Sequence, residues 1–176
     1  MIDVSSHPFG PNEWDVKIGL ELNHKEDNSF QEDGHKPVYC PPLSLCSLIA
    51  KIYPLPNGLQ GVDLLFDELR ISSTSYLNLC KPHWFSVKCI PIKASKKERK
   101  ITFDETGYRL PTAVEATILV MIEWLEGRSI SVLCQETVSS RHVVVKIEDA
   151  GTEVGLAFKK QYIREEGIEC YVVKAI

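Results

Sequence analysis

The stretch that decides the fold is TAVEATILVMIEWLEG, residues 112–127. Thr112 and Glu115 have the spacing of a capping box. In that motif the threonine hydroxyl accepts a hydrogen bond from an amide one turn later, and the glutamate reaches back to the start of the helix. Gly127 supplies the left-handed residue that commonly ends a helix. We therefore predict a helix over about residues 113–126.

This predicted helix has unusually many apolar side chains. Between residues 116 and 122 every residue except Thr117 is apolar, and Leu119 and Ile122 fall on the same side as Glu115. A helix that is apolar nearly all round is covered on more than one side. The stretch is therefore expected to be the central helix of the fold, or a helix that also contacts a protein partner or a second copy of the chain.

The chain after the helix has the pattern of a β-meander. Four β-rich segments are separated by short polar links, and short links favour antiparallel neighbours because a parallel crossover needs a dozen or more residues. The predicted strands are 129–135, 141–148, 152–159 and 168–176.

The chain before the helix is less regular. Apolar or small residues at every second position of residues 14–22 predict a strand, and an acidic, turn-rich loop follows over 23–37. Two prolines, at 41 and 42, can open a helix whose apolar stripe extends to Ile52. The other expected elements are a short helix near 63–69, a strand over 84–92 and its antiparallel partner over 101–103.

The strand over 84–92 contains Pro91, so we expect either an edge strand or a strand that ends there. With helices on one face of a mostly antiparallel sheet, the pattern predicts an α+β fold with two or three helices. The predicted division is an N-terminal segment, 1–37, and a single α+β domain, 38–176.

Composition is ordinary for a globular chain. The 176 residues are 44% hydrophobic and 25% charged, with a formal net charge of -4. No apolar run reaches the length of a membrane span, and the first residues do not resemble a secretion signal. We therefore expect a soluble cytoplasmic protein without a membrane contact, whose six cysteines stay reduced.

A basic run, KASKKERK, occupies residues 93–100. Such a run could neutralise phosphates of a nucleic acid, but a solvated hairpin tip that protects a sheet edge is the interpretation we favour. A single loop in an acidic chain differs from the basic face of a nucleic-acid module. The candidate contacts are Lys93, Lys96, Lys97, Arg99 and Lys100.

A polar stretch before the central helix brings together Asp104, Glu105 and Arg109. Paired carboxylates can act as acid and base when burial separates their pKa values, or can hold a hard cation. No second acidic cluster has a recognisable spacing, so we favour a turn that leads to the helix.

The segment CKPHWFSVKC offers Cys80, His83 and Cys89 as zinc ligands. Zinc sites usually combine two closely spaced pairs of ligands. Cys80 and His83 could be one pair, but the remaining candidates, Cys89 or His35, Cys40 and Cys46, have no usual spacing. We therefore expect no metal and no cofactor.

Cys134 and His142 lie on adjacent predicted strands and could approach each other as a nucleophile and its base. The neighbours of Cys134 are apolar, and a buried thiol is inert. Since no catalytic motif is complete, the sequence favours a non-catalytic binding or protein-interaction module. The alternatives are an enzyme that uses Cys134 and His142 or Asp104, Glu105 and Arg109, and a nucleic-acid binder that uses the basic run.

Overall fold

The computed structural model describes residues 8–23, 34–52, 77–95, 100–103, 106–138, 140–149, 154–163 and 167–176. The short helix predicted near 63–69 and most of the acidic loop predicted over 23–37 lie outside these residues.

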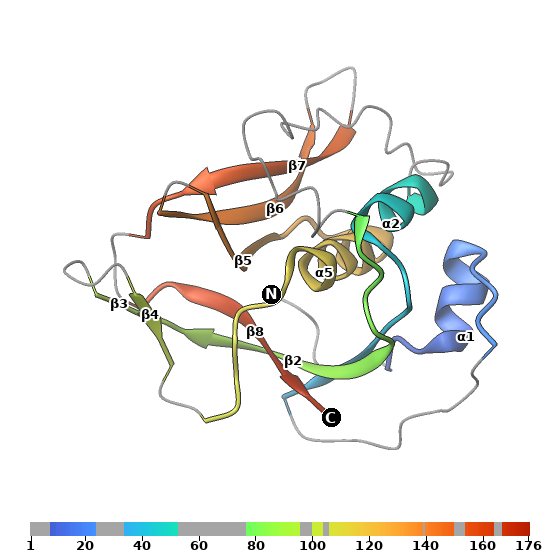
Figure 1. The fold of residues 1–176 in the computed structure, drawn as a ribbon, viewed down its shortest axis with the longest axis horizontal. Coiled ribbons are helices and arrows are strands. Elements are labelled where there is room, and N and C mark those ends of the chain that lie inside the picture. Colours follow the sequence, from blue (N-terminus) through green and yellow to red (C-terminus); the bar gives the residue numbers. More distant parts are fainter. Residues whose placement is uncertain are drawn as a thin grey trace.

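Two three-stranded antiparallel sheets and a small hairpin make up the β-structure (Figure 1). The first sheet has the order β1-β2-β8, with strands β1 (Lys36–Cys40), β2 (His83–Pro91) and β8 (Glu169–Ala175). The second has the order β5-β6-β7, with strands β5 (Ser131–Val138), β6 (Arg141–Asp149) and β7 (Val154–Gln161). The hairpin pairs β3 (Lys93–Ser95) with β4 (Lys100–Thr102). The predicted α+β class is confirmed.

Helix α5 (Ala113–Leu125) lies between the two sheets, as Figure 1 shows. All its residues from Ala113 to Glu123 are buried. The apolar residues among them form one hydrophobic cluster with side chains of both sheets, such as Phe85 and Val145. The prediction of a central helix covered on more than one side is therefore confirmed. Because this chain itself covers the helix, its apolar side chains do not indicate a partner.

The ends of α5 follow the local sequence signals. Thr112 Oγ1 accepts a hydrogen bond from the Glu115 amide at 3.2 Å, and Glu115 Oε2 accepts one from the Thr112 amide at 2.8 Å. Gly127 adopts a left-handed conformation with φ of 78°. The predicted capping box and terminating glycine are thus confirmed.

The strand predicted over residues 14–22 is wrong, because residues 14–18 are helical and residues 19–22 form no strand. Helix α1 (Pro11–Glu13) continues into a π-helical stretch, Trp14–Ile18. Trp14 and Ile18 are buried, whereas Val16 between them is 84% exposed. Residues four apart fit both a two-residue alternation and one face of a helix, so the apolar pattern did not discriminate between the two.

The N-terminal segment contributes to the main core. Phe9, Trp14 and Ile18 belong to the same hydrophobic cluster as residues of α5, and the Trp14 indole donates a hydrogen bond to the Tyr39 carbonyl at 2.9 Å. The division predicted after residue 37 stays a prediction.

The neighbours of strand β2 in its sheet differ from those predicted. It ends at Pro91, but it is the central strand of its sheet rather than an edge strand. It pairs with β1 and β8, whereas its predicted partner, β4, pairs with β3. Local signals located the strands but did not determine pairings between segments distant in sequence.

The predicted meander is confirmed for β5, β6 and β7. The fourth strand, β8, pairs instead with β2 in the other sheet, although its link to β7 is short. Helix α2 (Leu45–Ile52) begins later than the two prolines, because the Ser44 hydroxyl accepts a hydrogen bond from the Ser47 amide at 3.1 Å.

No helix in the described part of the chain combines the length and the apolar content that a membrane span requires.

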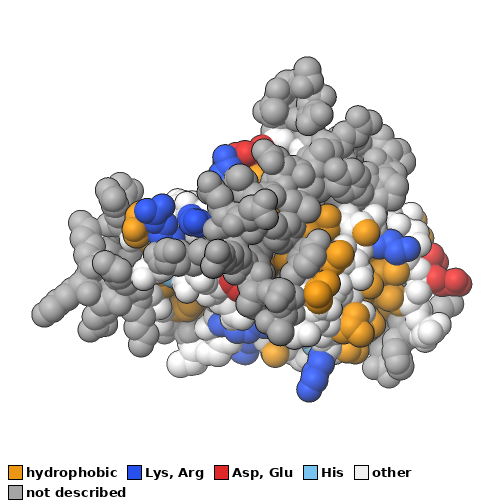
Figure 2. Space-filling view, turned by 45° about the horizontal axis from the view of Figure 1, so that its top comes forward, with side chains coloured by type: hydrophobic (Ala, Val, Ile, Leu, Met, Phe, Trp, Pro, Cys, Tyr) orange, Lys and Arg blue, Asp and Glu red, His pale blue; other side chains and the backbone are white. Residues whose placement is uncertain are grey.

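Figure 2 shows where described basic side chains lie on one face of the molecule. The described Lys and Arg side chains on this face lie at several separate places, with hydrophobic side chains between them. Residues 96–99 and the Lys100 side chain lie outside the described part of the chain, and Lys93 is exposed on β3. A nucleic-acid contact through the basic run therefore stays a prediction.

Candidate functional site

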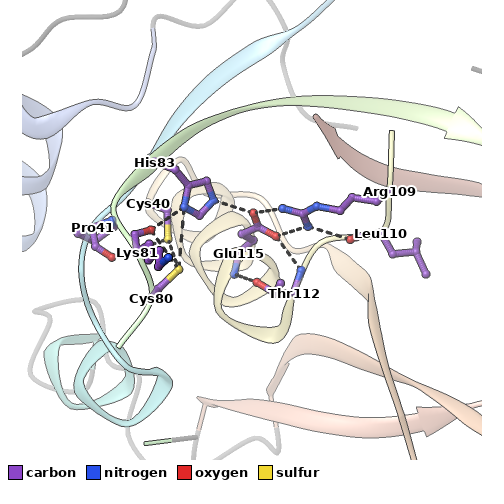
Figure 3. Close-up of polar contacts among 9 residues, drawn as sticks. All are labelled: Cys40, Pro41, Cys80, Lys81, His83, Arg109, Leu110, Thr112 and Glu115. Carbon is purple, nitrogen blue, oxygen red and sulfur yellow. Dashed lines mark hydrogen bonds and ion pairs between the residues drawn. The ribbon is translucent and has the colours of Figure 1, made fainter. Parts of the chain in front are cut away.

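Two cysteines and a histidine converge where β1 ends and β2 begins (Figure 3). Cys40 is the last residue of β1, and His83 is the first residue of β2. These two residues face each other in the antiparallel ladder, which places their side chains on the same face of the sheet. The Cys80 amide donates a hydrogen bond to the Leu43 carbonyl at 3.1 Å, and this bond fixes the segment that carries Cys80 beside the end of β1.

The three side chains form a compact group. The sulfur atoms of Cys40 and Cys80 are 3.4 Å apart, and Cys80 Sγ lies 4.0 Å from His83 Nδ1. One ligand atom from each residue lies within 4.8 Å of the other two. Cys40 is buried, whereas Cys80 and His83 are half-buried. The group is therefore reachable from solvent through Cys80 and His83.

A buried carboxylate connects the histidine to helix α5. Glu115 is fully buried, and its Oε1 lies 2.9 Å from His83 Nε2. Both Glu115 oxygens also accept hydrogen bonds from the Arg109 guanidinium at 2.7 Å. Arg109 is held in place because its backbone exchanges two hydrogen bonds with Val173 of β8. The capping glutamate therefore positions the histidine ring as well as the helix.

These contacts shift the pKa values of the group. A hydrogen bond from Cys40, together with the His83 ring, lowers the pKa of Cys80 to about 5. The contact with Cys80 and burial raise the pKa of Cys40 well above its ordinary value. The contact between the two sulfurs therefore favours the thiolate form of Cys80 and the thiol form of the more buried Cys40.

The contacts of His83 favour the charged form of its ring. Contacts with Cys80 and with Glu115 raise the pKa of His83 to about 10. Its Nδ1 also lies 2.7 Å from the Lys81 carbonyl oxygen, so both ring nitrogens face acceptors. Although burial opposes the charge of Glu115, the hydrogen bonds from Arg109 and His83 lower the pKa of that carboxyl to about 2.

The donor set fits zinc. Two thiolates and one imidazole are ligands that Zn²⁺ binds, and tetrahedral coordination places two sulfurs about 3.8 Å apart and a sulfur and a nitrogen about 3.6 Å apart. The observed separations, 3.4 Å and 4.0 Å, differ from these by a few tenths of an ångström. Binding through Nδ1 would require His83 and Cys40 to release their protons, as metal ligands do.

The second nitrogen of the histidine also has the environment of a metal ligand. A histidine that binds zinc usually donates its other N–H to a carboxylate, which fixes the tautomer and the orientation of the ring. Glu115 occupies this position behind His83.

Comparisons of the chain with protein-family models, curated proteins and solved structures found no match. Evidence for a function therefore comes from this geometry alone.

Of the ligands proposed from sequence, the structure brings Cys80 and His83 together but leaves Cys89 out of the group. The third member is Cys40, whose spacing in the sequence gave no signal. The pairing of Cys40 with His83 arises from the β1–β2 ladder. The only sequence signal for the site was the short spacing between Cys80 and His83.

The second pair proposed from sequence does not form a dyad. Cys134 is buried in the core, and burial raises the pKa of its thiol. His142 Nδ1 lies 3.1 Å from the Cys134 carbonyl oxygen, so the ring faces the backbone rather than the thiol. Asp104 and Glu105 lie outside the described residues, while Arg109 binds Glu115.

Proposed function

We propose that this chain is a zinc-binding module whose metal centre consists of Cys40, Cys80 and His83. The observation that supports this proposal is the convergence of two sulfurs and an imidazole nitrogen within 4.8 Å. The hydrogen bond from the His83 ring to a buried carboxylate adds to it. Soft thiolate ligands favour Zn²⁺ or Cu⁺ over Mg²⁺ and Ca²⁺.

A metal at this position would connect three parts of the fold. It would join the end of β1 to the segment before β2, and through His83 and Glu115 it would be coupled to the start of α5. Three protein ligands leave a fourth coordination position for water or another ligand. This role agrees with the non-catalytic binding module expected from sequence, which together with its protein partner or second copy stays a prediction.

The metal content of the purified protein tests the proposal. The full-length chain, loaded with zinc and dialysed, is expected to retain one zinc per chain by elemental analysis. Cys40→Ser and Cys80→Ser should abolish retention, because each removes one sulfur ligand. Cys89→Ser is the matched control, because Cys89 is also half-buried but lies outside the group; it should retain the metal.

The same variants can also refute the proposal. A wild-type chain that retains no zinc, or a Cys80→Ser chain that retains it as well as Cys89→Ser does, would refute the metal centre. Far-ultraviolet circular dichroism of each variant separates the loss of a ligand from a failure to fold.

A second function is favoured by the order of Cys80, His83 and Glu115. A thiol, an imidazole and an orienting carboxylate in a row is the arrangement of a nucleophile activated by its base. Alkylation of the metal-free protein tests it. Cys80 should react much faster than Cys89, and His83→Ala should remove the difference. Equal rates at the two cysteines would exclude the nucleophile.

We also propose a cytoplasmic location for the protein. All six cysteines are free, and thiols persist in a reducing compartment. Localisation of a tagged full-length chain by microscopy tests this, and a signal in the secretory pathway would contradict it.

A further inference from the structure

The two sulfurs of the site are close enough to react with each other. Their separation is 3.4 Å, and a disulfide bond is about 2.0 Å long, so the sulfurs must approach by about 1.4 Å. Both cysteines are free. Cys80 belongs to the segment that precedes β2 rather than to a strand, and its amide is bonded to the Leu43 carbonyl at 3.1 Å.

The two cysteines also differ in access. Cys80 is half-buried, whereas Cys40 is fully buried. A small oxidant can therefore reach Cys80, and the sulfur next to it is Cys40. This is the arrangement of redox-sensing cysteines, in which an accessible thiol is followed by a resolving thiol.

We propose that the site is a redox switch, in which a peroxide oxidises Cys80, Cys40 resolves the product as a disulfide, and the bound zinc is released. The inference rests on the proposed zinc centre. The switch would respond to a small hydroperoxide, and hydrogen peroxide is the probe for this chemical class.

The reaction balances in two steps. The Cys80 thiolate attacks one oxygen of hydrogen peroxide, the O–O bond breaks, and the hydroxide that leaves takes up a proton to become water. The Cys40 thiolate then attacks the Cys80 sulfur, the S–S bond forms, and the S–O bond breaks with loss of a second water after protonation. The two sulfurs supply the two electrons that reduce the peroxide.

The metal leaves because its ligand set has been consumed. A disulfide has no thiolate to offer, so only His83 remains of the three ligands. Reduction of the disulfide by a dithiol regenerates both thiols and should restore zinc binding. Release and recovery therefore make the switch reversible, unlike oxidation of a lone cysteine to a sulfinic acid.

The test uses the zinc-loaded full-length chain and hydrogen peroxide near equimolar concentration. Zinc content is measured first, then released zinc is followed with a chromophoric chelator while intact mass is recorded. Cys46→Ser is the background for peptide mapping, because Cys40 and Cys46 are close in sequence and would share a tryptic peptide. The expected result is one zinc released per chain that loses two hydrogens, with Cys40 linked to Cys80.

Each outcome decides between the proposals. A chain that contains no zinc before peroxide refutes the metal centre. A zinc-loaded chain that keeps its metal while Cys89 becomes oxidised refutes only the switch. So does a Cys80 that gains oxygen atoms without a link to Cys40. Cys40→Ser provides a further check, because Cys80 should then gain oxygen without losing two hydrogens.

Discussion

The contacts of Glu115 predict a specific cost for Glu115→Gln. Glutamine resembles the neutral, protonated form of glutamate, so the substitution removes the charge but keeps the shape. The carboxyl pKa is lowered from 4.5 to about 2, and each unit corresponds to about 1.4 kcal/mol. The free energy of unfolding at pH 7 should therefore fall by about 3 kcal/mol, which is also the lower end of the loss expected when one partner of a buried ion pair is removed.

Urea unfolding of the metal-free protein, followed by tryptophan fluorescence, measures this loss. The midpoint should shift while the denaturant dependence stays constant, because the change affects stability rather than compactness. Glu148→Gln is the matched control, since Glu148 pairs with two lysines but is 38% exposed and should cost less than about 1 kcal/mol. A Glu115→Gln chain that is destabilised no more than this control would refute the large contribution of the buried Glu115 carboxylate to stability.

The same substitution should also weaken zinc binding. Removal of a carboxylate behind a ligating histidine typically costs about 10- to 100-fold in metal affinity. Competition with a chelator of known affinity measures this, and the Glu148→Gln affinity should equal that of the wild type. An unchanged affinity in Glu115→Gln would show that the carboxylate does not support the metal ligand.

Further predictions concern the helix, acid stability and the buried thiol. Thr112→Ala should destabilise the protein by about 1 kcal/mol, because it removes the cap of α5. Leu119→Ala should destabilise it by about 2–5 kcal/mol, because it leaves a cavity. A variant with the same denaturation midpoint as the wild type would contradict the prediction made for it. Because the folded-state pKa of Glu115 lies below 4.5, its carboxylate stabilises the fold above that pH, and this contribution should disappear as the pH falls toward 2. Calorimetry should therefore show that the stability of Glu115→Gln depends less on acid pH than that of the wild type. The same pH dependence in both proteins would contradict this prediction. Cys134 should resist alkylation in the native protein while Cys80 reacts, and rapid labelling of Cys134 would contradict its burial.

Local signals in the sequence were sufficient to predict the elements of the fold after residue 112. The capping residues Thr112 and Glu115, the apolar run and Gly127 all act within a few residues of one another. The meander of β5, β6 and β7 likewise follows from short links. These features do not depend on distant parts of the chain, which is why their prediction succeeded.

Pairings between distant segments were not predictable in the same way. The position of β2 between β1 and β8 depends on which surfaces cover α5, and no pattern within β2 contains that information. The N-terminal helix was mistaken for a strand because Trp14 and Ile18 are compatible with either period. Tertiary contacts such as the Trp14 bond to Tyr39 distinguish the two structures.

The candidate site shows the same limit. The sequence offered Cys80 and His83 as a pair, but the third ligand, Cys40, is placed beside them only by the β1–β2 register. Glu115 was recognised as a helix cap. Its contacts with His83 and Arg109 appear only when the first sheet packs against the start of α5.

X-ray absorption at the zinc edge tests the metal centre most directly. The zinc-loaded wild-type chain should show two sulfur neighbours at about 2.3 Å together with a nitrogen neighbour at about 2.0 Å, and the zinc-loaded Cys89→Ser chain should show the same shell. A shell of nitrogen and oxygen only, or one that loses sulfur in Cys89→Ser, would show that zinc binds elsewhere.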